Sequence, residues 1–447
     1  MGTSVSEGLR MKGLRFPPYR SLEDCIGQGI DGPCFAWPLL TVDDAALDHN
    51  ITTAAGVFAA FGAQHAPHAK THMSAHIWKR QEAAGAWGPT VANPAQLCTV
   101  VDWGVTRAYV ANEFVDIRDV LWLRSVLEAG IAGQATLREV WLQVDSRAGV
   151  EVLAHGLRGA SSELISRIGI LVELGYLGGR SGVRSVQAAV DLARHVVHSG
   201  LRLVGVAGYE GQAAAQADAQ GLMAVTSWCQ LLLAVRDQIE PWVERLPNGS
   251  VGQGPVYISA GGSSFIDVVL ETLRPHARTR LMVRSGAYAL HDHVHYSHLD
   301  PWGRLASHPL VSGGKGADLA MRPAITVWGQ VLSVPEPGLA IVGIGKRDIS
   351  CDLDMPIALW VRTCDPQGVF LAGQARGLEG VQVTQLNDQH TYLSFPVGSP
   401  GAAYPEGLSV GDVVGLGISH PCTTMDKWRM ALLMSADRVA DIYPLDF

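Results

Sequence analysis

From residue 66 to about residue 290, short apolar runs alternate with longer stretches of helical spacing. The apolar runs are rich in β-branched residues, and a polar or glycine-rich turn follows each of them, as is typical of strands. Eight strands separated by helices predict a parallel sheet closed into a barrel. The expected fold class is therefore α/β with a TIM-type (β/α)8 barrel. The predicted strands lie near 66–71, 88–92, 107–112, 139–145, 168–174, 202–208, 256–260 and 280–285.

The clearest helical patterns lie between these strands, at 74–86 and 185–200. The second pattern ends at Gly200, a residue type that commonly ends helices. The segment 236–255 is rich in proline, glycine and charge, which predicts a loop inserted before the seventh strand.

Beyond about residue 300, short apolar runs recur without long helices, which predicts a separate C-terminal β domain. A strand-like segment at 33–43 precedes the barrel and could pair with that domain. The predicted organisation is an N-terminal segment at 1–43 pairing with the β domain, a cofactor-binding barrel at 44–300, and a β domain with metal ligands at 301–447.

Composition excludes several classes of protein. The formal net charge is -8 and no long run of Lys or Arg occurs, which argues against nucleic acid as a partner. No apolar stretch approaches the ~20 residues that cross a bilayer, so no membrane partner is expected. The N-terminus lacks the apolar core of a signal peptide, and the seven cysteines form no CxxC pair. Both features favour a reducing, cytoplasmic location.

Lys70 stands at the end of the first predicted strand, in PHAKTHMS at 67–74. An isolated lysine at a strand end is usually explained by a packed stem and a charge that reaches water. The chemical interpretation is that a desolvated lysine amine is suited to Schiff-base formation. The strand end also faces the catalytic mouth of a barrel. Lys70 is therefore a candidate catalytic residue.

A glycine-rich turn follows the seventh predicted strand, in ISAGGSS at 258–264. Gly261, Gly262 and Ser263 expose successive backbone N–H groups, which can bind a phosphate. Phosphate sites in TIM barrels commonly follow strands seven and eight. A tight turn without a ligand is the alternative. A lysine and a phosphate loop at one mouth support each other more than either does alone.

Two further loops carry polar residues at the same mouth. Arg180 and Arg184 lie on a glycine-rich loop after the fifth strand, and arginine binds planar anions. A solvent-exposed loop arginine is the alternative. Tyr209 and Glu210 follow the sixth strand. Tyr209 could hydrogen-bond a cofactor or pack as an aromatic ring at the barrel rim.

The segment HPCTT pairs an imidazole, His420, with a thiol, Cys422. In an extended segment, residues two apart share a face, so both could reach one ion. Thiolate favours zinc over magnesium, calcium or manganese, and two protein ligands leave positions for water and substrate. From the residues alone, a buried cysteine and a loop histidine remain the alternative.

A second histidine-rich segment is HDHVHYSH at 291–298. His291, His293 and His295 alternate, so a strand would place them on one face, and such clusters can bind metal. The alternative is a substrate-facing role at the active-site mouth, with Asp292 orienting one of the imidazoles.

Five motifs occur in order: PHAKTH, GGRSGVR, GYEG, AGGSS and GDVVGLGISHPCTT. Together they resemble the metal-dependent D-serine dehydratase and D-threonine aldolase family, part of the alanine-racemase-like fold type III of pyridoxal-phosphate enzymes. The resemblance runs from about residue 36 to the C-terminus. It implies a barrel plus a C-terminal β domain, a homodimer, and action on D-configured β-hydroxy amino acids.

The resemblance also assigns residues. Lys70 matches the lysine that holds pyridoxal 5'-phosphate as a Schiff base, and Arg180 and Tyr209 match residues beside the cofactor. His420 and Cys422 match the paired metal ligands, with zinc as the expected ion and manganese as the alternative. The full set of matched cofactor positions is Lys70, Arg180, Tyr209, Gly261, Gly262 and Ser263.

The implied activity is that of a D-amino-acid ammonia-lyase that converts D-serine or D-threonine to a 2-keto acid and ammonia. Lys70 would remove the Cα proton and zinc would activate the β-hydroxyl. In this family, dehydratases place a thiol where Cys422 stands and aldolases a carboxylate. The alternatives are retro-aldol cleavage to glycine and an aldehyde, dehydration of a polyhydroxylated D-amino acid, and a non-catalytic carrier of pyridoxal phosphate. The segments 236–255 and 291–316 depart from shorter family members, which leaves the substrate undetermined.

Overall fold

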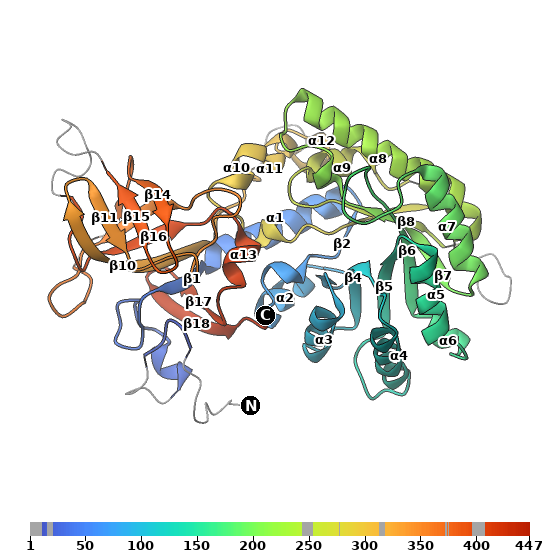
Figure 1. The fold of residues 1–447 in the computed structure, drawn as a ribbon, viewed down its shortest axis with the longest axis horizontal. Helices are drawn as coiled ribbons and strands as arrows, with labels where there is room; N and C mark the ends of the chain where they lie inside the picture. The colour runs from blue at the N-terminus through green and yellow to red at the C-terminus, as the bar shows by residue number, and fades with distance from the viewer. Residues whose placement is uncertain are drawn as a thin grey trace.

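The protein has two bodies, a barrel and a β domain, that lie side by side with helix α13 (Pro421–Met425) at their junction (Figure 1). The computed structural model describes residues 11–15, 21–243, 254–276, 278–312, 318–371, 373, 375–395 and 407–447.

The barrel is a single eight-stranded parallel sheet in the order β2-β9-β8-β7-β6-β5-β4-β3. Its two ends meet, because Trp87 N donates to His65 O at 2.7 Å and Thr90 N to Pro67 O at 2.8 Å. A parallel bridge between His68 and Thr90 adds to this closure. The predicted fold class is confirmed. The strands are β2 (Gln64–His65), β3 (Thr90–Val91), β4 (Arg107–Glu113), β5 (Glu139–Val144), β6 (Ile168–Leu174), β7 (Arg202–Gly208), β8 (Val256–Ala260) and β9 (Thr279–Val283).

The first predicted strand is wrong in its span. Instead of running through 66–71, β2 ends at His65, and Ala69–Thr71 form a 3-10 helix, η2. Pro67 has no N–H and cannot continue a ladder of hydrogen bonds. The chain turns instead, and Met73 N donates to Ala69 O at 2.7 Å. Lys70 therefore lies on a helical turn after the strand.

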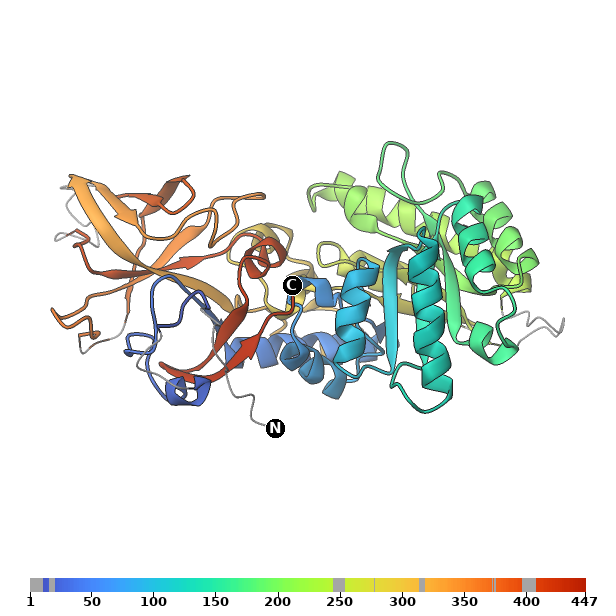
Figure 2. The same cartoon turned by 60° about the horizontal axis from the view of Figure 1, so that its bottom comes forward.

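Helices cover the outer face of the barrel sheet (Figures 1 and 2). The predicted patterns at 74–86 and 185–200 correspond to α2 (Ala75–Ala83) and α7 (Val186–His198). Gly200 follows α7 with φ +76°, the left-handed conformation that favours glycine. The other helices of this layer are α3 (Pro94–Asp102), α4 (Ile117–Ile131), α5 (Arg147–Gly156), α6 (Ser162–Ser166), α8 (Ala219–Ile239) and α9 (Ile266–Thr272).

Side chains at the helix starts explain why these helices begin where they do. Each N-cap oxygen accepts a hydrogen bond from a backbone N–H of the first turn, which contributes about 1 kcal/mol to helix stability. The caps of α3, α4, α5, α6, α7 and α8 are Asn93, Asp116, Ser146, Ser161, Ser185 and Asp218. Large side chains fill the barrel interior, among them the buried Tyr109 and Trp141.

The β domain is a ten-stranded mixed sheet whose main path runs β13-β12-β16-β10-β1-β17-β18. β11 pairs with β10 and β15, and β14 pairs with β15. The strands are β1 (Leu39–Asp43), β10 (Ile325–Glu336), β11 (Leu339–Val342), β12 (Ile357–Arg362), β13 (Arg376–Gly377), β14 (Gln382–Leu386), β15 (Thr391–Ser394), β16 (Val413–Gly417), β17 (Met430–Ser435) and β18 (Arg438–Pro444).

Strand β1 comes from the N-terminal segment and lies between β10 and β17. It is antiparallel to β10, with Val42 opposite Ile325, and Asp43 N donates to Ala324 O at 2.8 Å. The whole barrel is thus inserted between two neighbouring strands of the β domain. Helix α1 (Asp44–Ala60) leads from β1 into the barrel. The return path includes η5 (Ala287–Ala289), α10 (His295–Leu299), α11 (Pro301–Leu305) and α12 (Pro309–Ser312).

Three further features belong to the chain as a whole. Among the described residues, none of the helices combines the length and hydropathy that crossing a bilayer requires. All seven cysteines are free thiols. In the predicted loop 236–255, α8 continues to Ile239 and η4 (Glu240–Trp242) comes next. Residues 244–253 of that loop lie outside the described residues.

Candidate active site between the barrel and the β domain

Lys70 lies on η2, at the carboxyl end of β2, where the barrel meets the β domain. Helix α13 of the β domain packs on this turn (Figure 1). The Lys70 side chain is half-buried and forms no ion pair or hydrogen bond with another described residue. Its amine is therefore available for a covalent bond to a carbonyl compound.

A half-buried histidine, His68, lies among the positive charges around Lys70. Burial lowers the pKa of His68 well below its ordinary value, and the charges of Lys70, Arg284 and Arg180 lower it further. His68 is therefore neutral at physiological pH. Its Nδ1 and the Nε of Arg284 are buried and have no hydrogen-bond partner among the described residues. Unpartnered polar atoms beside clustered cations fit a polar, anionic ligand such as pyridoxal phosphate.

Arg284 follows β9 and was not among the residues predicted from the sequence. Its side chain is buried and donates to Gly208 O. Its guanidinium carbon lies 5.4 Å from the centroid of the Tyr109 ring. The sequence signal was an arginine directly after a buried strand, in LMVRSG, at the mouth of the barrel.

The structure brings the predicted pair Arg180 and Tyr209 together. The Arg180 guanidinium carbon lies 5.0 Å from the centroid of the Tyr209 ring. Burial raises the pKa of Tyr209 to about 12, with a further contribution from Glu210. Tyr209 is therefore a neutral phenol. A Cβ at Gly262 would come within 2.6 Å of the Tyr209 ring, so glycine allows the loop to pack against this tyrosine.

Two backbone amides of the glycine-rich loop donate hydrogen bonds to a side chain of the protein itself, a contact that was not predicted from the sequence. The buried Glu210 carboxylate accepts hydrogen bonds from Gly261 N at 3.0 Å and from Gly262 N at 2.6 Å. Burial raises the pKa of Glu210, and these two hydrogen bonds oppose that rise. The next amides, those of Ser263 and Ser264, have no partner among the described residues. They are the loop donors open to a phosphate.

The candidate metal ligands lie at the start of α13. The extended segment expected for 420–422 is wrong beyond its first residue, because Pro421 begins a helix that His420 caps. His420 Nδ1 donates to Asp352 Oδ2 at 2.7 Å. The Cys422 thiol donates to Thr71 Oγ1 at 3.3 Å, directly beside Lys70 in the chain.

The electrostatics of this pair suit a metal ion. Burial opposes ionisation of the Cys422 thiol, but its hydrogen bonds to His420 and Thr71 and the charges of His420 and Lys70 together lower its pKa. Burial also disfavours a charged His420, yet its interactions with Cys422 and Asp352 raise the pKa. Nitrogen and sulfur donors fit zinc. No group of three His, Cys, Asp or Glu side chains with metal-binding geometry occurs within the described ranges. A bound ion would therefore complete its coordination with water or substrate.

The histidine-rich segment does not form the expected strand. His291 has φ +49°, and α10 begins at His295. The three alternating imidazoles therefore do not share one face. His293 N donates to Ile418 O at 3.0 Å, which ties this segment to the loop that carries His420. Tyr296 on α10 is half-buried, and its interactions with Cys422, Tyr209 and Ser263 place it within the candidate site.

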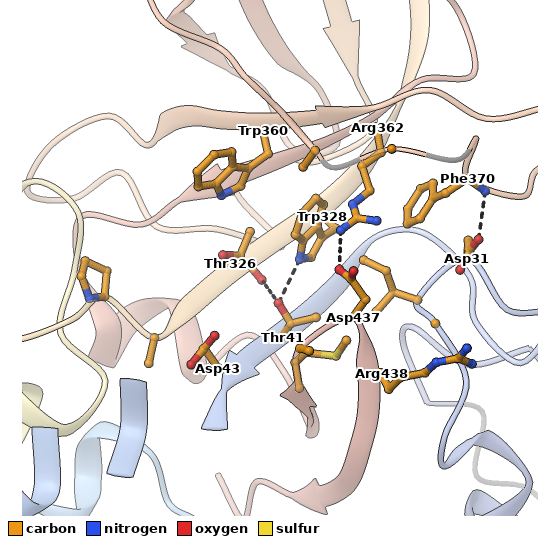
Figure 3. Close-up of a pocket in the computed structure, with 18 of the residues that line it drawn as sticks. Asp31, Thr41, Asp43, Thr326, Trp328, Trp360, Arg362, Phe370, Asp437 and Arg438 are labelled. Carbon is orange, nitrogen blue, oxygen red and sulfur yellow. Dashed lines mark hydrogen bonds and ion pairs between the residues drawn. The ribbon is translucent and has the colours of Figure 1, made fainter. Parts of the chain in front are cut away.

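A cavity with a volume of about 790 Å³ lies elsewhere, mainly in the β domain (Figure 3). Polar side chains that line this cavity form ion pairs and hydrogen bonds with one another. Arg362 pairs with Asp437, and Trp328 Nε1 donates to Thr41 Oγ1 at 2.9 Å. Of the candidate ligands, His293 lines this cavity, whereas Lys70, the other predicted cofactor-binding residues and the pair His420 and Cys422 do not. The candidate active site is therefore the junction around Lys70.

Comparisons with known proteins agree with this architecture. Residues 324–434 match the family model described as "Putative serine dehydratase domain". The curated 3-hydroxy-D-aspartate aldolase of Paracoccus denitrificans is 24% identical over 350 residues, which are 76% of this chain and 81% of that protein. The crystal structure of D-threonine aldolase from Filomicrobium marinum has a TM-score of 0.69 at 22% identity and covers 94% of this chain and 97% of its own. D-threo-3-hydroxyaspartate dehydratase from Delftia sp. HT23 has a TM-score of 0.65 at 19% identity, with 92% and 97% covered.

A parallel barrel inserted into a β domain, with a lysine turn at their junction, is an alanine-racemase-like fold. Alanine racemase from Bacillus anthracis shares it, with a TM-score of 0.54 at 14% identity over 92% of this chain and 99% of its own. The matches confirm the resemblance that the motifs indicated, to the D-serine dehydratase and D-threonine aldolase family.

Proposed function

We propose that this chain is a lyase dependent on pyridoxal phosphate and zinc, which dehydrates and deaminates a D-configured β-hydroxy amino acid. The products would be a 2-keto acid and ammonia, with D-serine or D-threonine as substrate. The observation that carries the proposal is the contact between Cys422 Sγ and Thr71 Oγ1 at 3.3 Å. This contact holds the candidate metal pair beside Lys70, so one substrate could meet both.

The residues at the junction divide into two groups. Lys70 would hold the cofactor covalently, Arg180 and Tyr209 would flank it, and the loop at Ser263 would bind its phosphate. His420 and Cys422 would hold the zinc ion. When bound, pyridoxal phosphate supplies an electron sink for a carbanion at Cα. When bound, zinc supplies a Lewis acid for the β-hydroxyl.

The chain's own residues prepare this chemistry. The Lys70 amine, without an acidic partner, could act as the base that takes the proton from Cα of the substrate. The cations Arg180 and Arg284 favour anionic groups in the site. Tyr209 and His68 are neutral and half-buried, so they offer hydrogen bonds without adding charge. Helix α13 closes one side of Lys70 and limits its access to water.

Dehydration is favoured over retro-aldol cleavage because Cys422 places a thiol at the second metal position. The runner-up is cleavage to glycine and an aldehyde, which the relatives named as aldolases support. Dehydration of a polyhydroxylated D-amino acid would use the same residues.

We also propose that the protein is a homodimer in a reducing, cytoplasmic compartment. Light scattering after gel filtration would test the homodimer, and cellular fractionation would test the location.

The proposal predicts a defined product pattern. Purified protein with pyridoxal phosphate and zinc should release keto acid and ammonia from D-serine or D-threonine, and not from the L-isomers. A chelator should abolish turnover, and added zinc should restore it. Lys70→Ala should lower kcat by at least ~10³-fold, because it removes both the cofactor bond and the base.

Coupled dehydrogenase assays for keto acids and for aldehydes measure the two product classes separately. Glycine plus aldehyde would replace the dehydratase proposal with the aldolase. Turnover that resists chelation would remove zinc from the mechanism. Full function of Lys70→Ala in cells would favour the non-catalytic cofactor carrier.

A further inference from the structure

Asp352 lies in the segment between β11 and β12 of the β domain. Both oxygens of its carboxylate accept hydrogen bonds from side chains at the start of α13. Oδ2 accepts from His420 Nδ1 at 2.7 Å, and Oδ1 accepts from Thr423 Oγ1 at 2.9 Å. The two donors flank Cys422 in the sequence. One carboxylate therefore fixes the start of the helix on both sides of the candidate sulfur ligand.

This arrangement determines which ring nitrogen of His420 is free. A neutral imidazole carries one proton, and a carboxylate at Nδ1 keeps that proton on Nδ1. The lone pair then remains on Nε2, the nitrogen open to a metal ion. A carboxylate that orients a ligating histidine in this way also raises its basicity.

A second set of hydrogen bonds supports the backbone behind the imidazole. Ser350 Oγ donates to His420 O at 3.1 Å and lies 2.7 Å from Thr424 Oγ1. The segment 350–352 thus contacts the backbone of His420 through Ser350 and its side chain through Asp352. Because the main-chain position is held separately, a change at Asp352 should alter the ring and leave the helix in place.

We propose that Asp352 is the positioning residue of the metal pair, which holds His420 in the tautomer and orientation that bind zinc. The inference rests on the proposed zinc site and adds a residue outside the ligand pair. It concerns binding of the ion itself, so it can be tested without turnover.

The chain offers a matched control two residues away. Asp354 has nearly the same side-chain exposure as Asp352, 45% against 47%. Its carboxylate faces His295, with Nδ1 at 3.8 Å, and contacts neither candidate ligand. Asp352→Asn and Asp354→Asn therefore remove the same charge from the same loop, and only the first removes the carboxylate that faces His420.

The test is zinc affinity of the full-length protein, measured by competition with a chelating dye at fixed pH. Asp352→Asn should bind zinc roughly 10- to 100-fold more weakly than the wild type. Asp354→Asn should stay within about twofold of the wild type, and Asp352→Glu should recover part of the loss. Cobalt substitution adds a spectroscopic signature. The sulfur-to-cobalt charge-transfer band should persist in Asp352→Asn, because Cys422 is unchanged.

Equal zinc affinities of Asp352→Asn and Asp354→Asn would overturn the inference. Loss of the charge-transfer band in Asp352→Asn would also overturn it, since the whole site and not the imidazole would then depend on Asp352. A wild-type protein that binds no zinc would instead refute the proposed function. Unfolding midpoints of the two Asn variants should coincide, which checks that the loop remains folded.

Discussion

Glu113, at the end of β4, is a carboxyl group in an unusual environment. One oxygen accepts from Asp145 N at 3.2 Å, and Oε1 is buried without a partner among the described residues. Burial raises the pKa of Glu113 to about 8, and the carboxylates of Asp145 and Glu173 contribute to the rise. The group is therefore largely protonated at neutral pH, although it lies at the catalytic mouth of the barrel.

Glu113 should make the protein less stable as pH rises. The folded state keeps the proton up to about pH 8, whereas the unfolded state loses it above about pH 4.5. Between these values the folded state binds more protons, so the free energy of unfolding falls with rising pH. The side chain introduced by Glu113→Gln cannot ionise. Above pH 8, the free energy of unfolding of this variant should therefore exceed that of the wild type by on the order of 3 kcal/mol.

Urea unfolding at pH 5.5 and pH 8.5 measures this difference. Glu82→Gln is the control, because Glu82 is exposed on α2 and its carboxylate forms no hydrogen bond with another described residue. The explanation fails if Glu113→Gln and Glu82→Gln show the same change of stability between the two pH values.

Among the elements, the glycine-rich loop after β6 is held by its own arginine. Arg184 donates to the carbonyl oxygens of Ser181, Gly179 and Arg180 at 2.7–2.8 Å. Gly175 N donates to Val183 O at 2.9 Å and closes the base of the loop. Arg184, considered from sequence as an anion-binding residue, therefore supports the loop that presents Arg180 to Tyr209.

Arg184→Lys should loosen this loop, because one ammonium group cannot replace the planar fork of donors. Amide hydrogen exchange at 176–183 should accelerate roughly fivefold, and pyridoxal phosphate should bind roughly fivefold more weakly, equivalent to ~1 kcal/mol. Arg194→Lys is the control, because Arg194 pairs with Asp191 on the surface of α7. Unchanged exchange at 176–183 in Arg184→Lys would contradict the bracing role.

In the molecule as a whole, the barrel is an insertion in the β domain. Strand β1 fills the gap between β10 and β17, although about 280 residues of chain separate it from β10. The end of β1 and the start of β10 are neighbours in an antiparallel pair, so the chain leaves the β domain and returns at nearly the same point. Insertions of this kind are tolerated because the termini of the inserted domain lie close together.

This topology predicts that the β domain can fold without the barrel. Residues 21–43 joined to 324–447 by Asn-Gly should form a hairpin from β1 and β10 and give a monodisperse, cooperatively folding protein. Residues 324–447 alone should aggregate, since β10 and β17 would expose unpaired edges. Gel filtration and thermal unfolding monitored by circular dichroism distinguish the two. A well-folded 324–447 fragment would show that β1 is dispensable.

The fold class and the elements that carry the site could be predicted from the sequence because the relevant information is local. Periodicity predicted the barrel and the β domain, and polar residues after buried strands indicated Lys70, Arg180 and Tyr209, since carboxyl ends of parallel strands share one mouth. The turn at Lys70 and the helix at His420 were predicted as extended, because Pro67 and Pro421 mark a change of backbone without fixing the conformation of the residues after them.

Contacts between distant residues could not be predicted in this way and depend on the tertiary structure. Asp352 and His420 are hydrogen-bonded although 68 positions separate them in the sequence, and Cys422 and Thr71 although 351 positions separate them. The Glu210 carboxylate likewise accepts hydrogen bonds from amides of the glycine-rich loop. A hydrogen bond depends on distances of a few tenths of an ångström, and the packing of two whole domains sets those distances. Local sequence therefore determines which elements form and which residues they carry, whereas the pairing of their side chains is determined only in the folded chain.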